Sequence, residues 1–275
     1  MINFRPRHFA CWLLAALLVL PFTATGAVWF QDDFEAYAPG TNLIGQGGWV
    51  GTGINLVNSA THLSGTSLLG PPNSGLSQLN VFGHSVGGAL SAGEIYTLSF
   101  SAYAQTTTPV SHSSGLGIGN TAATLTGSFA NGAMWVPVEY AFNSFGWRFD
   151  ARQLTGGSGD YVTLSGGYDA IENLEVVIDT LAMEVYGRYD FGSGLLDTVH
   201  YSITAAQLAG IDAVAGYADY RGQNYGASTP YGKTFSNAEY DNIQFASSAA
   251  ANVPAPSVLT LLLAGLLALG VRRRC

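Results

Sequence analysis

Alternation of apolar and polar residues dominates the middle of the chain. The segment Ile95–Tyr103 reads IYTLSFSAY, so an extended strand would turn its aromatic and aliphatic residues to one face and its Ser and Thr residues to the other. Four further segments are predicted as strands: Trp135–Phe142, Glu175–Tyr186, Thr198–Ile203 and Tyr240–Phe245. Gly-rich clusters at 45–53, 115–120 and 156–159 are predicted as turns.

One short helix is expected over Thr204–Ile211, with Thr204 as its N-cap. Many short strands separated by Gly-rich turns, without regular alternation of strands and helices, are typical of a sandwich. The pattern therefore predicts an all-β sandwich or jelly roll over residues 28–250.

The N-terminal end follows a different pattern. Arg5 and Arg7 precede an apolar run from Phe9 to Phe22, and small residues follow at 23–27. A basic start, an apolar centre and a small-residue cleavage site indicate a helical secretory signal peptide over residues 1–27. The apolar run is short for a membrane span, which needs about 20 residues.

The C-terminal end carries a second apolar segment, at 257–271. It follows Val253, Pro254, Ala255 and Pro256 and precedes Arg272, Arg273 and Arg274. As a helix this segment would be about 22 Å long, a short transmembrane helix. Its arginines would stay on the cytoplasmic side.

Residues 252–275 resemble the PEP-CTERM sorting signal, in which a Glu is usual where Ala255 stands here. The resemblance implies that the chain is an exosortase substrate, processed by that membrane-embedded cysteine protease-transpeptidase after transient membrane association. It also implies export through the inner membrane of a Gram-negative bacterium, to the cell surface or the exopolysaccharide matrix of a biofilm.

Charge is sparse and one-sided in the predicted domain. Without the terminal segments the chain keeps five basic residues against all 18 acidic ones, a net charge of −13. Nucleic acid and anionic lipid surfaces are therefore excluded as partners. Both cysteines, Cys11 and Cys275, lie in the terminal segments, so the domain has no disulfide or thiolate-metal site.

The start and the end of this domain carry a second resemblance. FQDDFEAY from Phe30, GQGGW from Gly45 and EYDNIQF from Glu239 resemble the first and last strands of concanavalin A-like (laminin-G-like) domains in PEP-CTERM proteins. The resemblance implies a two-sheet jelly roll whose first and last strands lie side by side. It also favours a non-catalytic domain that binds carbohydrate or matrix components.

Two close acid pairs belong to these terminal segments. Asp33 with Glu35, and Glu239 with Asp241, each have the spacing that places two carboxylates on one strand face. Paired terminal strands would gather all four, where repulsion raises their pKa values unless a hard cation such as calcium binds. The alternative is that they are solvated acids on edge strands.

A polar, Gly-containing stretch near the end of the domain is rich in tyrosine. Tyr217, Tyr220 and Tyr225 accompany Arg221 and Asn224. Aromatic rings beside amides and Arg suit stacking on sugar faces and hydrogen bonds to hydroxyls. The alternative is that these tyrosines cover the core of a β protein.

A catalytic alternative rests on GHSVG, the serine-hydrolase motif around Ser85, with Asp197 and His200 downstream in the order of a triad. The motif needs a helix after the serine, and the chain leaves no room for one before Ile95. The histidines show no metal-ligand spacing.

A glycosidase is disfavoured because no E-x-D-x-E sequence occurs. Asp179 and Glu184, five residues apart in one predicted strand, would also face opposite sides. The remaining alternative is a structural matrix protein without a specific ligand.

Overall fold

The structure is a computed structural model, and it describes residues 26–52, 56–59, 63, 65–69, 79–104, 113–120, 138–143, 146–167, 169–219 and 238–249. The sorting segment at 252–275 and all of the signal peptide except Gly26 and Ala27 lie outside these ranges. Within them, no helix combines the length and the apolar character needed to cross a membrane. The terminal segments therefore stay predictions from the sequence.

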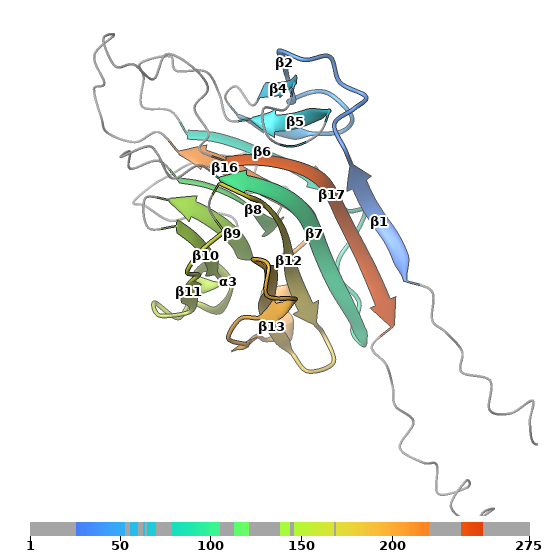
Figure 1. Ribbon diagram of the computed structural model, residues 1–275. Helices are drawn as coiled ribbons and strands as arrows, with labels where there is room; N and C mark the ends of the chain where they lie inside the picture. Colours follow the sequence, from blue (N-terminus) through green and yellow to red (C-terminus); the bar gives the residue numbers. More distant parts are fainter. Residues whose placement is uncertain are drawn as a thin grey trace, which may run out of the picture.

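The described strands form two antiparallel sheets, which pack face to face (Figure 1). Sheet A has the strand order β14 (Leu196–Asp197), β13 (Glu184–Asp190), β12 (Ile171–Asp179), β7 (Glu94–Ala104), β17 (Ala238–Ala249), β5 (Thr66–Leu69), β4 (Leu56–Ser59) and β2 (Thr41–Asn42). Two further strands join it, β1 (Ala27–Asp32) beside β17 and β15 (Tyr201–Ser202) beside β13.

Sheet B has the order β11 (Tyr161–Thr163), β10 (Gly146–Asp150), β9 (Val138–Asn143), β8 (Ser113–Gly119), β16 (Ala213–Asp219), β6 (Leu79–Ser85) and β3 (Val50–Thr52). The inner face of each sheet is the one turned toward the other sheet, and the outer face is turned away. Two stacked antiparallel sheets confirm the predicted all-β jelly-roll sandwich.

The core lies between the two inner faces and is built by alternation along each strand. In β7 the side chains of Tyr96, Leu98 and Phe100 are buried, whereas Thr97 and Ser99 are half-buried on the outer face. The largest core side chains come from both sheets and include Trp49, Trp147, Tyr140, Phe149 and Phe245. Burial of these aromatic rings is the main stabilising contribution that a domain without disulfides has available.

The first and last described strands are neighbours, as the sequence predicted. β1 runs antiparallel to β17, with Ala27 opposite Ser247 and Gln31 opposite Gln244. The chain therefore enters and leaves the domain at the same end (Figure 1). Both predicted processing segments attach there.

The single strand predicted over Glu175–Tyr186 is wrong. The chain turns at 180–183, and β12 and β13 form a hairpin in which Asp179 lies opposite Glu184. Asp179 ends β12 because its Oδ1 accepts the backbone N–H groups of Leu181 and Ala182, at 2.9 and 2.8 Å. The expectation that Asp179 and Glu184 face opposite sides is therefore also wrong.

The turn predicted over 115–120 is a strand in the structure. Gly115, Gly117 and Gly119 occupy alternate positions of β8. A Cβ atom on Gly115 would lie 2.6 Å from Oε2 of Glu139 and from a ring carbon of Tyr217. Glycine here allows close packing of side chains over the sheet and does not mark a turn.

The predicted helix is confirmed in a shortened form. Helix α4 spans Ala205–Leu208, and Thr204 is its N-cap, with a capping box to Gln207. A second short helix, α3 (Arg152–Thr155), follows β10 and was not predicted. With one turn each, neither helix changes the all-β class.

Candidate functional site

A pocket of about 730 Å³ opens beside the β1–β17 pair. It is lined by aromatic rings, side-chain amides, two carboxylates and small residues: Trp29, Phe30, Gln31, Asp32, Asp33, Ala36, Tyr37, Gly47, His84, Ser99, Asn242, Ile243 and Gln244. The sequence pointed to Asp33 in this set, but not to Gln31, Gln244 or His84. Gln31 and Gln244 meet through the register of β1 and β17, and His84 reaches the pocket from β6 of sheet B, which no local pattern predicts.

A β-bulge in β17 shapes this pocket. The pairing of β17 with β7 shifts between Asp241 and Gln244, and Asn242 adopts a left-handed conformation with φ 52°. Before the bulge β17 pairs with β5, and after it with β1. The bulge therefore marks the point where one neighbouring strand replaces the other and leaves room for a pocket.

Asp32 anchors the loop that forms one wall. Its carboxylate accepts hydrogen bonds from the backbone N–H of Phe34 at 2.8 Å, from Tyr37 Oη at 2.6 Å and from Trp49 Nε1 at 2.7 Å. Burial, followed by the bond to Asp32, raises the pKa of the Tyr37 hydroxyl. Gly47 completes the wall at φ 54°, where a Cβ atom would collide with the Tyr37 hydroxyl.

His84 joins this loop to sheet B. Its Nδ1 lies 2.7 Å from the carbonyl oxygen of Ser85, and its Nε2 lies 2.9 Å from that of Gly47. The ring stacks on Phe30 at a centroid distance of 4.3 Å. The pocket therefore has a rigid aromatic side, built from elements that the sequence separates by more than 50 positions.

The four predicted calcium ligands lie near the same end of β17. Glu239 and Asp241 belong to β17, but Asp33 and Glu35 follow the end of β1, so the expectation that these two share a strand face is wrong. The reason is the bond from Phe34 N–H to Asp32, which turns the chain away from the strand. Burial first, and then the charges of Glu35, Asp33 and Asp32, raise the pKa of Asp241 to about 6.

The donor atoms suit calcium by chemistry, since all are carboxylate oxygens. Their arrangement does not suit it, because the described residues contain no group of three or more His, Cys, Asp or Glu side chains able to hold a metal ion. Glu35 and Glu239 each accept a backbone N–H, from Thr66 at 2.8 Å and from Leu63 at 3.2 Å. In this arrangement the carboxylates fasten loops to the sheet.

Of the predicted tyrosine cluster, the structure describes Tyr217 alone. This side chain is 1% exposed and donates a hydrogen bond from Oη to Oε1 of Glu139, at 3.3 Å. Tyr220, Arg221, Asn224 and Tyr225 lie outside the described residues.

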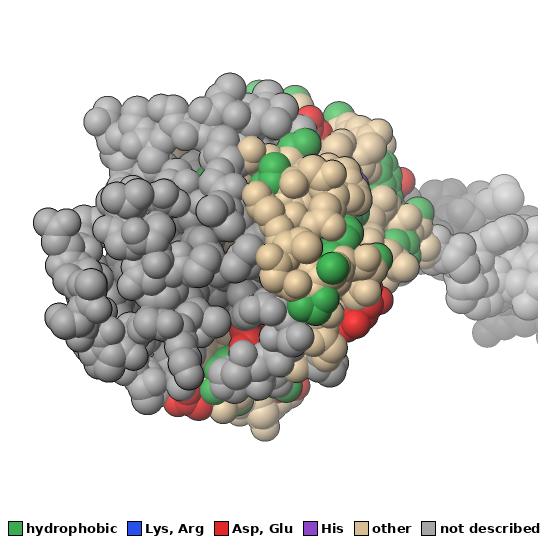
Figure 2. Space-filling view, turned by 90° about the horizontal axis from the view of Figure 1, so that it is seen from above, with side chains coloured by type: hydrophobic (Ala, Val, Ile, Leu, Met, Phe, Trp, Pro, Cys, Tyr) green, Lys and Arg blue, Asp and Glu red, His purple; other side chains and the backbone are tan. Residues whose placement is uncertain are grey.

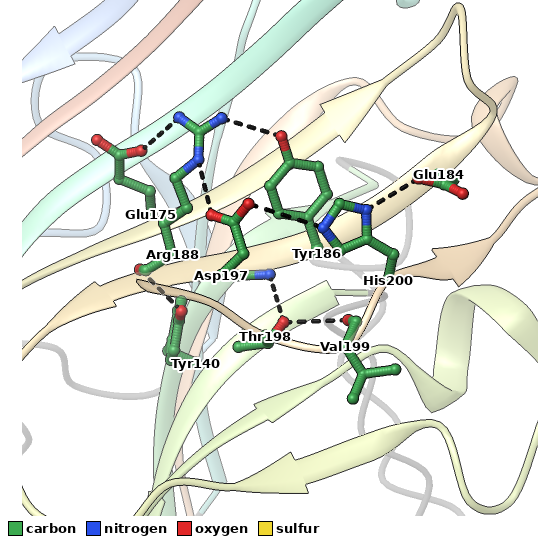
Figure 3. A network of polar contacts seen from close by, with 10 residues as sticks. Tyr140, Glu175, Glu184, Tyr186, Arg188, Asp197, Thr198, Val199 and His200 are labelled. Carbon is green, nitrogen blue, oxygen red and sulfur yellow. Dashed lines mark hydrogen bonds and ion pairs between the residues drawn. The ribbon is translucent and has the colours of Figure 1, made fainter. Parts of the chain in front are cut away.

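The structure brings Asp197 and His200 together but places Ser85 elsewhere. His200 Nδ1 lies 2.9 Å from Glu184 Oε2, and its Nε2 lies 3.8 Å from Asp197 Oδ2 (Figure 3). Ser85 ends β6 in sheet B, where its Oγ accepts the N–H of Gly87 at 3.2 Å. The next element is strand β7, so the helix that a serine nucleophile needs does not follow.

A second acid pair, missed in the sequence, lies on the outer face of sheet B. Glu139 of β9 is directly opposite Asp150 of β10. Glu139 is 1% and Asp150 4% exposed, and Asp150 forms ion pairs with Arg148 at 3.1 Å and Arg152 at 2.6 Å. Their burial closes this pair to a polymeric substrate.

Comparison with solved structures supports the fold described above. No protein-family model matches the chain, and a search of the curated proteins found no match. Among solved structures, the chain is similar to a lectin from Bauhinia forficata in complex with GalNAc, with 10% identity, a TM-score of 0.50, and coverage of 82% of this chain and 99% of the lectin.

It is also similar to an endo-1,3-beta-glucanase from Streptomyces sioyaensis, with 12% identity, a TM-score of 0.50, and coverage of 84% of this chain and 99% of the glucanase. At such low identity the likeness shows the fold alone. The domain therefore shares a two-sheet jelly-roll fold with this lectin and this glucanase.

Proposed function

We propose that this chain is an exported, non-catalytic carbohydrate-binding protein whose ligand site is the pocket beside β1 and β17. The lining of the pocket carries the proposal. Trp29 and Tyr37 offer ring faces for stacking on sugars, while Gln31, Asn242 and Gln244 offer amide donors and acceptors for hydroxyl groups. The fold shared with a GalNAc-bound lectin supports the class of ligand.

A glycan array with the purified full-length protein tests this proposal. A double variant, Gln31→Ala with Gln244→Ala, should weaken binding about tenfold or more, because two pairs of hydrogen bonds to the ligand are lost. Thr163→Ala, an exposed polar change on β11 of the other sheet, is the matched control. An array without any bound glycan would contradict the proposal and favour a structural matrix protein.

The proposal includes secretion by the signal peptide and exosortase processing near Val253–Pro256. It is supported by the sequence of the last 24 residues and by the attachment of both terminal segments at one end of the domain. The intact mass of the exported protein is the test. A product that retains Cys275 in a host with a working exosortase would contradict processing and indicate a lasting anchor.

We also propose calcium binding by Asp33, Glu35, Glu239 and Asp241, because these four acidic side chains gather near one end of β17. The support is electrostatic, since burial first and then the charges of Glu35 and Asp33 raise the pKa of Asp241. The described arrangement of their oxygens does not itself form the site.

Serine hydrolysis is not part of the proposal. Both ring nitrogens of His200 face carboxylates on sheet A, and Ser85 lies on sheet B. A fluorophosphonate probe should therefore leave the protein unlabelled, and labelling abolished by Ser85→Ala would overturn this exclusion.

A further inference from the structure

The pocket continues into a row of polar side chains across the outer face of sheet A. Strand register places Gln31 opposite Gln244, Gln244 opposite Ser99, and Ser99 opposite Glu175. Glu175 in turn lies opposite Arg188, which lies opposite Asp197. Directly opposite residues share a face, so the six side chains form one line.

This line crosses β1, β17, β7, β12, β13 and β14, which lie side by side in the sheet (Figure 1). Neighbouring strands are about 4.8 Å apart, so five intervals extend over about 24 Å. One sugar ring fills only part of that length. A chain of several sugars is the kind of ligand that reaches from the pocket to the far end.

Arg188 is held in place at that far end (Figure 3). Its Nη1 lies 3.3 Å from Glu175 Oε2, its Nε lies 3.2 Å from Asp197 Oδ1, and its Nη2 donates to Tyr186 Oη at 2.9 Å. His200 stacks on Tyr186 with ring centroids 3.9 Å apart. The side chains of this network are therefore ordered before any ligand arrives.

The charge along the row is negative. Among the described residues, Arg188 is the single Lys or Arg on this face, and two carboxylates already neutralise it. Further acids lie near the row. Asp190 and Asp241 occupy the next same-face positions on one side, although Asp241 is 2% exposed. On the other side Asp179 and Glu184 lie one same-face position further away, beyond Val177 and Tyr186. Figure 2 shows another side of the molecule, from above, where the described surface also carries Asp and Glu patches and shows no Lys or Arg side chain.

We propose that this row binds a linear polysaccharide that carries free amino groups, a partly de-N-acetylated amino-sugar polymer, with one sugar in the pocket. The inference rests on the proposed carbohydrate-binding function and adds the class of ligand. Cationic amino groups lying over a row bordered by carboxylates gain a favourable electrostatic interaction, whereas uronic-acid polymers are repelled.

Calorimetric titration of the full-length protein with defined oligosaccharides tests the inference. The probes are glucosamine oligomers of two to six units, the N-acetylated hexamer and a galacturonic acid hexamer. The glucosamine hexamer should bind about tenfold or more tightly than the other hexamers and than its own dimer. Its affinity should fall between 50 and 300 mM salt, since screening weakens exposed charge pairs.

An added positive charge in the middle of the row provides the matched comparison. Ser99→Lys should weaken binding of the glucosamine hexamer about tenfold, because it adds a positive charge beside the ligand. Thr163→Lys makes the same charge change on β11 of sheet B and should leave affinity unchanged.

The outcomes separate this inference from the function on which it rests. Neutral and cationic hexamers bound equally well, or Ser99→Lys and Thr163→Lys behaving alike, would overturn the amino-sugar row and leave carbohydrate binding standing. Absence of binding to every probe and to the glycan array would overturn both.

Discussion

The outer faces of the two sheets use the same residue types in different surroundings. On sheet A, Arg188 joins Glu175 and Asp197 at side-chain exposures of 27–49%. On sheet B, Arg148 and Arg152 join Asp150, which is 4% exposed, with Glu139 directly opposite at 1%. Each face carries an arginine–carboxylate network and a tyrosine, but the carboxylates are open to solvent on sheet A and buried on sheet B, and we call the two the open and the closed network.

Solvent access gives these two networks different consequences. In the closed network, burial and then the charge of Asp150 raise the pKa of Glu139 well above its ordinary value, and its Oε2 has no hydrogen-bond partner. In the open network water can solvate each carboxylate, so the ion pairs cost little to break. The buried acids of sheet B are therefore expected to affect stability more than the exposed acids of sheet A, which remain accessible from solvent.

The largest expected effect comes from breaking the closed network. Asp150→Ala removes a buried carboxylate and leaves Arg148 and Arg152, whose side chains are 17% and 31% exposed, without this anion. It should lower the free energy of unfolding by about 3 kcal/mol, the lower end for breaking a buried ion pair. Urea denaturation measures the change. Asp160→Ala, which removes a half-exposed carboxylate before β11, should cost less than about 1 kcal/mol. Equal midpoints for the two variants would show that the buried ion pairs do not carry this stability.

Calcium binding at one end of sheet A should have the next largest effect on the stability of the protein. If the ion binds at Asp33, Glu35, Glu239 and Asp241, free calcium at 100 times its Kd raises the free energy of unfolding by about 2.7 kcal/mol. EDTA should then lower the Tm, and Asp241→Asn should remove most of the difference. A Tm that stays constant from EDTA to millimolar calcium would rule the ion out.

Glu139→Gln should stabilise the protein at pH 8 by about 1–2 kcal/mol, because no carboxylate then has to ionise inside the sheet. The direction of this pH dependence follows from the raised pKa of Glu139 in the folded protein. The unfolded chain releases this proton near pH 4.5 while the folded protein still holds it, so stability is lost as the pH rises. At pH 4.5 the variant and the wild-type protein should therefore unfold at similar urea concentrations.

Two further carboxyl groups with raised pKa values, Glu172 and Asp241, should also make the protein less stable as the pH rises. Burial, with the charge of Asp190, raises the pKa of Glu172 to about 7, and the pKa of Asp241 is raised to about 6. The wild-type protein should accordingly be more stable at pH 5 than at pH 8 in the absence of calcium. A midpoint that rises over this range would contradict the assignment of these three groups.

The smallest effect is expected in the open network. Glu175→Gln removes one exposed ion pair of Arg188 and should change the free energy of unfolding by about 0–1 kcal/mol. Raising the salt concentration should shrink even this difference, because the pair is exposed. A loss as large as that of Asp150→Ala would show that the two faces are alike after all.

Local patterns predicted the class of fold but not every element. The alternation in Ile95–Tyr103 and the cap at Thr204 specify a strand and a helix start within a few residues, and the structure contains both. The hairpin between β12 and β13 was missed because Val176–Ile178 and Val185–Tyr186 are apolar on both sides of the turn. Glycines in β8 were misread since glycine serves tight turns and tight packing equally well.

The sequence by itself determined an all-β, acidic, cysteine-free domain with two distinctive ends, because these properties depend on composition and on neighbours along the chain. Tertiary structure alone decided that Gln31, Ser99 and Arg188 share a row, and that Glu139 is buried beside Asp150. Cross-strand register and solvent exposure depend on contacts between residues tens to hundreds of positions apart. They arise only when the whole core packs, which no short segment encodes.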